Sequence, residues 1–167
     1  MRIRHSLYLL FAVAIQSFCC ADVTKFATAN PSGGGLPAED RKVLLDSSRF
    51  HEVHSTHDLA AAIVKLCAED SHIADPGQKW NATDSTIDPT LPGKRLIYAA
   101  VGGEYYVVHY ERGGIAHTFH ILVAKLTKAD AKPKVVWRAI GGPFKNYAAF
   151  LDALRSGKLD DRLDYPH

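Results

Sequence analysis

The sequence predicts an α+β fold: a four-stranded antiparallel β-meander packed on one face by helices, including a C-terminal helix. Residues 95–140 contain four segments rich in Val, Ile, Tyr, Phe and Trp, the residue types that favour strands. Pairs of glycines or a short polar turn separate these segments, which is typical of hairpins. Apolar residues at helical spacing occur before and after the four segments, so helices are expected to cover one sheet face and to leave the other partly open.

The first 21 residues are predicted to be a cleavable secretory signal peptide. Arg2 and Arg4 precede an uncharged, mostly apolar stretch at 6–15, and small residues occupy the −3 and −1 positions of a cut after Ala21. The mature chain would then begin at Asp22. Its expected location is periplasmic or secreted, with no stable membrane insertion after cleavage.

Two alternatives for this leader stay open. An uncleaved membrane anchor is disfavoured because a spanning helix needs about 20 apolar residues and Gln16 interrupts this stretch. A lipoprotein signal is disfavoured because Phe18, directly before Cys19, is bulky where a small residue is expected.

Removing the leader changes the charge and cysteine counts. The chain has 20 Lys and Arg against 18 Asp and Glu, and without Arg2 and Arg4 both totals are 18. A neutral domain with no long basic run lacks the surface that phosphate contacts need, so no nucleic-acid partner is expected. Of the three cysteines, only Cys67 lies beyond the leader, which excludes an internal disulfide.

Residues 22–37 have the composition of a flexible linker, because they are small and polar and contain Gly33-Gly34-Gly35. Residues 38–167 are then predicted to be a single α+β domain. A mature chain of this length buries enough surface to fold without disulfides.

Two helices and a short strand are predicted before the meander. The first helix opens at 37–40, and 49–54 is a short strand. Ser55 is the expected N-cap of the second helix. The apolar residues of that helix recur at helical spacing, and they are Leu59, Ile63, Leu66 and Cys67.

Residues 71–93 show little periodicity and are predicted to be a loop of more than 20 residues. Loops of this length in compact domains are uncommon and often functional. Trp80 within it is expected either to pack the loop onto the domain or to contact a ligand or partner.

The four meander strands are predicted at 95–101, 104–112, 115–127 and 134–140. Asn146 is then expected to cap a last helix, which Gly157 ends. The apolar stripe of this helix comprises Tyr147, Phe150, Leu151 and Leu154.

Histidines are the first candidates for chemistry, because imidazole titrates near neutral pH and binds metals. His51, His54 and His57 are candidate metal ligands, but their spacing of three differs from the zinc-protease pattern of two histidines four apart. The alternative is that they are exposed or capping residues.

Three more histidines lie on the predicted meander. With a three-residue loop between the second and third strands, His109 stands opposite His117. With a two-residue loop, His109 faces Thr118 and has His120 as its diagonal neighbour. Both registers place two histidines side by side.

The same strands supply candidate catalytic and binding residues. His109 or His120 is the candidate general base, with Glu104 as its partner; Glu111 is the other acidic neighbour considered. A protein-binding face is predicted from the enrichment of aromatic residues at interfaces. Its candidate residues are Trp80, Tyr105, Tyr106, Tyr110, His109 and His117.

Three hypotheses for function follow. The first is an exported small binding protein, for example an inhibitor or immunity-type protein acting on a partner protein. The second is a small hydrolase or metal-binding enzyme that uses the sheet histidines, and the third is a carrier of a small apolar ligand. No catalytic, nucleotide or calcium-binding motif is present, so no cofactor is expected and the enzyme hypothesis is the weaker one.

Overall fold

The structure is a computed structural model that describes residues 34–69, 72–84, 88–129, 132–162 and 164, all within one compact unit. The predicted signal peptide and all of the predicted linker except 34–37 lie outside the described residues. Leu36, near the end of that linker, is buried, and its backbone N–H donates to the carbonyl of Asp161 (2.6 Å). Within the described residues, no helix is both long and apolar enough to cross a membrane.

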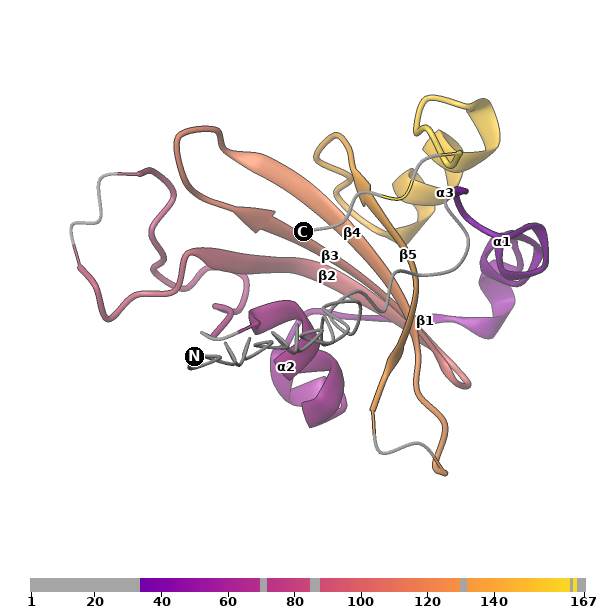
Figure 1. Cartoon of the computed structure of the whole chain (residues 1–167), viewed down its shortest axis with the longest axis horizontal. Coiled ribbons are helices and arrows are strands. Elements are labelled where there is room, and N and C mark those ends of the chain that lie inside the picture. The colour runs from indigo at the N-terminus through magenta and orange to yellow at the C-terminus, as the bar shows by residue number, and fades with distance from the viewer. Residues whose placement is uncertain (1–33, 70–71, 85–87, 130–131, 163, 165–167) are drawn as a thin grey trace, which may run out of the picture. The chain divides into compact units, whose positions relative to one another are not determined.

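In the described part of the chain, three α-helices and five strands form the fold (Figure 1). Two short 3₁₀ turns, η1 (Ser47–Arg49) and η2 (Thr56–Asp58), lie among the first elements. In chain order the main elements are α1 (Ala38–Leu45), β1 (His51–Val53), α2 (Ala61–Ala68), β2 (Lys94–Gly102), β3 (Tyr105–Arg112), β4 (Thr118–Lys125), β5 (Lys134–Ile140) and α3 (Tyr147–Ser156).

The sheet is antiparallel with the order β1-β2-β3-β4-β5, so the α+β class and the meander are confirmed. It has five strands rather than four, because β1 pairs with β2 from His51↔Val101 to Val53↔Ala99. The pattern at 49–54 indicated a strand but not its partner. Packing is consistent with this pairing, since Phe50, the residue directly before β1, packs against the core cluster that contains Leu44 and Trp137.

Helices cover both faces of the sheet, which corrects the expectation of one covered face. On one face, α1 and α3 bury Leu44, Phe150 and Leu154 against strand residues such as Trp137. On the other, α2 buries Ile63 and Cys67 in a second apolar cluster. Figure 1 shows the sheet passing between α2 and the pair α1 and α3. The second face is covered because the apolar residues of α2 also have to be buried against the sheet.

The C-terminal helix agrees closely with its prediction. The Asn146 side chain accepts a hydrogen bond from the Ala149 backbone N–H (2.9 Å), and Gly157 has the left-handed conformation (φ 70°) that ends many helices. The second helix differs, because Ser55 caps η2 by accepting from the His57 N–H and α2 begins only at Ala61.

The β3–β4 connection is longer than either predicted loop. Arg112 pairs with Thr118, which leaves a five-residue loop at 113–117 and puts His109 opposite Ile121. Both predicted registers are therefore wrong, and β4 begins at Thr118 rather than at Ile115. The cause is a long-range contact: Gly114 forms a parallel bridge with Thr83, so the loop pairs with a distant segment instead of closing a tight hairpin.

Candidate functional site

His109, the candidate general base, lies in the core with both ring nitrogens engaged. Its Nδ1–H donates to the carbonyl of His120 (2.9 Å), and its Nε2 accepts from the Phe144 backbone N–H (3.2 Å). This pattern is that of a neutral imidazole with its proton on Nδ1, since a carbonyl can only accept. Burial lowers the pKa of His109 below its ordinary value. The ring packs against Tyr98 and Phe144 and is fully buried.

His120 lies on the other side of the sheet from His109. Its ring stacks on Tyr110 (centroids 5.2 Å apart), and its Nε2 lies 2.7 Å from the Thr118 hydroxyl. His120 and Tyr110 are both buried, Tyr110 in the cluster that α2 covers. The structure thus separates the two histidines that were candidates for one catalytic site.

The predicted aromatic face divides between two environments. Tyr105 is buried and donates to Asp40 (2.6 Å), which also pairs with Lys125 (2.6 Å) and so fastens α1 to the sheet. Tyr106 is half-buried against the α2 cluster, and Glu104 is exposed in the turn before β3. Binding or catalytic roles for these residues stay predictions.

The candidate metal ligands His51, His54 and His57 are all exposed. His54 Nε2 lies 3.0 Å from a Glu52 carboxylate oxygen. Among the residues that the structure describes, no group of three or more His, Cys, Asp or Glu side chains is placed to hold a metal ion.

A second set of predicted residues does come together, around Glu111 at the end of β3. The Glu111 side chain is only 8% exposed and accepts from Arg95 Nε (2.6 Å) and from His117 Nε2 (2.7 Å). Arg95 offsets the buried charge, as a buried carboxylate requires. The same carboxylate orients the half-exposed His117 ring.

Trp80 packs onto this ion pair from the long loop. The Arg95 guanidinium lies over its indole ring (5.1 Å), a cation–π arrangement, and the His117 ring meets it edge-on (5.4 Å). Trp80 therefore both packs the loop onto the sheet and keeps a half-exposed surface. The two predicted roles for Trp80 are compatible.

Backbone contacts hold the long loop against the β3–β4 loop. The Gly113 N–H donates to the carbonyl of Gly93 (2.9 Å), and a Cβ at Gly113 would overlap the backbone of Asn81 and Ala82. Asn81 in turn fixes its own loop, since its side-chain amide donates to the carbonyls of Asp88 (2.8 Å) and Leu91 (3.1 Å). Only glycine permits this close approach at 113.

Ile115 stands at the tip of this supported loop with 96% of its surface exposed. Single exposed apolar residues are common, but this one is almost fully exposed, and the residue two positions later, His117, packs on Trp80. We call the group Trp80, Arg95, Ile115 and His117 the β3–β4 loop surface. Figure 1 shows the β3–β4 connection and the chain leading into β2 at the same end of the sheet.

Sequence reasoning named Trp80 and His117 but missed Arg95 and Ile115. The composition of 115–127, rich in residues that favour strands, predicts a strand that includes Ile115. Its neighbours Gly113 and Gly114 were the available signal, because glycines are typical of turns and loops.

No protein-family model matches this sequence, and the searches of curated proteins and of solved structures found no significant match.

Proposed function

We propose that this chain is an exported binding protein of the inhibitor or immunity type, which acts on a partner protein in the periplasm or outside the cell. The β3–β4 loop surface is its contact site. The observation that carries this proposal is Ile115, a large apolar side chain held almost fully exposed at the tip of a loop that two glycines fasten to a neighbouring segment.

The energetics favour binding at this surface. Burying an exposed isoleucine side chain gains about 1.5–3 kcal/mol. A loop already held by backbone contacts loses little further entropy on binding, so more of that gain appears as affinity. Trp80 and Arg95 are residue types that dominate interface energies, and Trp80 packs on His117, two positions after Ile115. A projecting loop with such an anchor suits insertion into a concave site on the partner.

Export rests on the leader alone. Expression of the full chain in a bacterial host should yield a periplasmic or extracellular product whose N-terminal residue is Asp22. A cytoplasmic product that still carries residues 1–21 would contradict the export part of the proposal. The binding part is tested separately.

Capture experiments test the binding part. The purified protein is immobilised and exposed to extract from its source, and retained proteins are compared for wild type, Ile115→Asp and Trp80→Ala. Ile140→Asp is the matched control, since Ile140 is the other large apolar residue exposed among those described (43%) and lies on β5. We expect a stoichiometric partner that the two loop variants lose and the control keeps.

Tyr106→Ala tests the sheet face that the sequence also suggested. Loss of the partner in Tyr106→Ala but not in Ile115→Asp would move the contact site to that face. If the wild-type protein retains no partner, the proposal that this chain is a binding protein is refuted.

One observation favours the enzyme alternative. His117 Nε2 is oriented by the buried carboxylate of Glu111, as the base of a hydrolase is oriented by an acid. However, His117 contacts Glu111, Trp80 and Phe119, none of which carries a hydroxyl or thiol nucleophile. Ester or amide hydrolysis that is lost in both His117→Gln and Glu111→Gln would establish the enzyme reading instead.

A further inference from the structure

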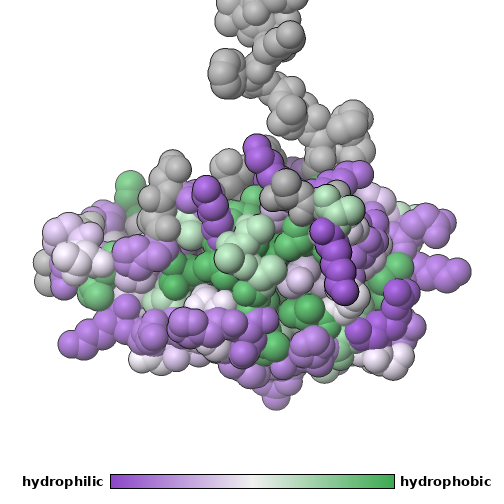
Figure 2. Space-filling model, turned by 90° about the horizontal axis from the view of Figure 1, so that it is seen from below, coloured by the Kyte–Doolittle hydropathy of each residue, from purple (hydrophilic) through white to green (hydrophobic). Residues whose placement is uncertain are grey.

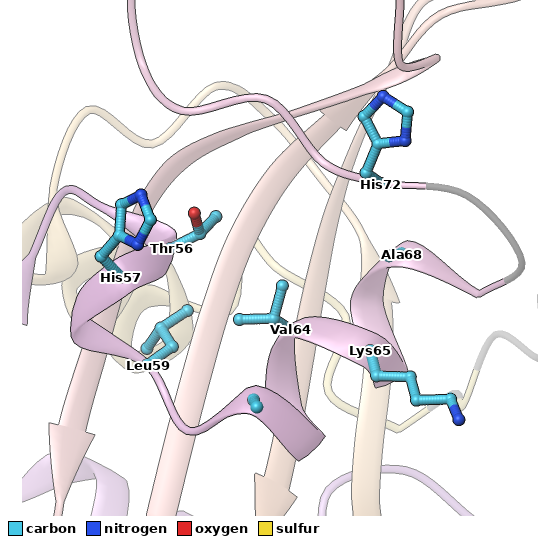
Figure 3. Close-up of a pocket in the computed structure, with 8 residues that line it drawn as sticks. Thr56, His57, Leu59, Val64, Lys65, Ala68 and His72 are labelled. Atoms are coloured by element: carbon cyan, nitrogen blue, oxygen red, sulfur yellow. The ribbon is translucent and has the colours of Figure 1, made fainter.

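We propose that the groove beside α2 binds a small amphipathic carboxylate, that is, a carboxylic acid with a medium-length apolar chain. The groove has a volume of about 470 Å³ and lies between η2, α2 and the segment that begins at His72 (Figure 3). This volume is in the range of small-molecule sites. The site is separate from the β3–β4 loop surface and does not depend on the function proposed above.

The groove has an apolar floor. Leu59, Ala61, Val64 and Ala68 line it, and Figure 3 shows Val64 between the two sides of the opening. Leu59 and Ala68 are buried beneath the floor, whereas Ala61 is exposed and Val64 is half-buried. Figure 2 views the molecule from below Figure 1, the side on which α2 lies, and shows hydrophobic residues across the middle of that side with hydrophilic residues around them.

The walls are held by contacts with the rest of the fold. Asp75 accepts from the Thr56 backbone N–H (2.6 Å) and from the Ser55 hydroxyl (3.1 Å), which fixes η2 beside the 72–75 segment. That segment is joined to β2, because the Leu96 N–H donates to the carbonyl of Ala74 (2.8 Å). The groove therefore exists before a ligand arrives, which limits the entropy lost on binding.

The polar rim decides the ligand class. His57, Lys65 and His72 are the ionisable residues that line the groove, and none of the lining residues is acidic. Figure 3 places His57 and His72 on opposite sides of the opening. An apolar floor with basic residues at its rim is complementary to a molecule that has an apolar chain and one negative group. A purely apolar ligand would leave the rim unused, and a cation would meet like charge at Lys65.

The test is a titration of the purified full-length chain with octanoate, followed residue by residue in amide NMR spectra. Octanol and acetate are the comparison ligands. Octanol keeps the apolar chain without the negative charge, and acetate keeps the carboxylate without the chain. Saturating shifts are expected with octanoate at 56–68 and at His72, the residues around the groove. Octanol should bind about two- to fivefold more weakly, the effect of one exposed charge contact, and acetate should not saturate.

Variants locate the site. Lys65→Met should weaken octanoate by about two- to fivefold, and Ala61→Trp, which fills the groove from an exposed position, should abolish saturation. Lys42→Met on α1 is the matched control, since Lys42 is exposed and lines a different hollow; it should leave octanoate affinity unchanged. Circular dichroism should show that each variant is folded.

Three results would overturn the proposal: no saturation by octanoate at millimolar concentration, saturating shifts confined to residues outside the groove, or equal affinity for octanoate and octanol. An unchanged affinity in folded Ala61→Trp would likewise overturn it. None of these outcomes depends on whether a protein partner is captured.

Discussion

Replacing His109 by glutamine should remove a specific part of the pH dependence of stability. The imidazole is fully buried and neutral, with Nδ1–H donating to His120 and Nε2 accepting from Phe144. Glutamine keeps one donor and one acceptor but cannot titrate. Because the aromatic contacts of the ring are lost, His109→Gln should lower the free energy of unfolding by about 1–3 kcal/mol at neutral pH.

The pH effect has a definite sign. Burial lowers the pKa of His109 in the folded protein, whereas in the unfolded chain the residue titrates near its ordinary value of about 6.5. Below that pH the unfolded chain binds a proton that the folded protein does not, so stability is full above about pH 6.5 and falls as the pH is lowered. If the folded histidine stays neutral, acidification from pH 7.5 to pH 5.5 lowers the free energy of unfolding by about 1.4 kcal/mol for this one group.

Urea denaturation at these two pH values measures the effect. The decrease in unfolding free energy on acidification should be smaller in His109→Gln than in wild type by about 1.4 kcal/mol or less. Ile121→Val, at the residue that pairs with His109, controls for simple destabilisation and should keep the wild-type pH dependence. An equal pH dependence in wild type and His109→Gln would refute the assignment of a buried neutral imidazole.

Three further predictions concern single residues. Gly113→Ala should lower the free energy of unfolding by about 1–3 kcal/mol in urea denaturation, because its methyl group would overlap the backbone of Asn81; unchanged stability would mean that the two loops are not in contact. Tyr98→Phe should raise it by about 1 kcal/mol, since the Tyr98 hydroxyl is buried and has no hydrogen-bond partner among the described residues; a loss of that size would reveal a partner. Cys67 should not react with a thiol reagent in the native state and should react in denaturant, because burial raises its pKa to about 12; rapid native labelling would show that α2 opens readily.

Local signals predicted the local structure well. The helix α3 follows from residues within a few positions of one another, namely Asn146 at its start, Gly157 at its end and one apolar stripe between them. The strands β2 to β5 follow from their composition and from the glycine pairs or short polar turn between them, although β4 begins later than predicted. In each case the interaction that defines the element lies within the element or beside it.

The errors occurred where distant residues decide the structure. The β3–β4 register depends on the bridge between Gly114 and Thr83, some 30 positions apart in the chain, so the two glycines alone could not determine it. The fifth strand depends on the pairing of His51 with Val101. The burial of His109 depends on Phe144, which approaches from the segment after β5.

The candidate site was predicted only in part for the same reason. Trp80 and His117 were named because of their residue type, but what joins them is the carboxylate of Glu111 and the guanidinium of Arg95 on a neighbouring strand. Ile115 became a candidate only once its exposure was known, since the composition of 115–127 predicts a strand that includes it.

The affinity of the captured partner for loop variants tests the central claim most directly. We expect Ile115→Asp to raise the dissociation constant by at least about 30-fold, the effect of losing an interface residue worth about 2 kcal/mol, while Ile140→Asp leaves it within about twofold of wild type. An Ile115→Asp variant that is folded and binds the partner as tightly as wild type would contradict the claim that this chain acts through its β3–β4 loop surface.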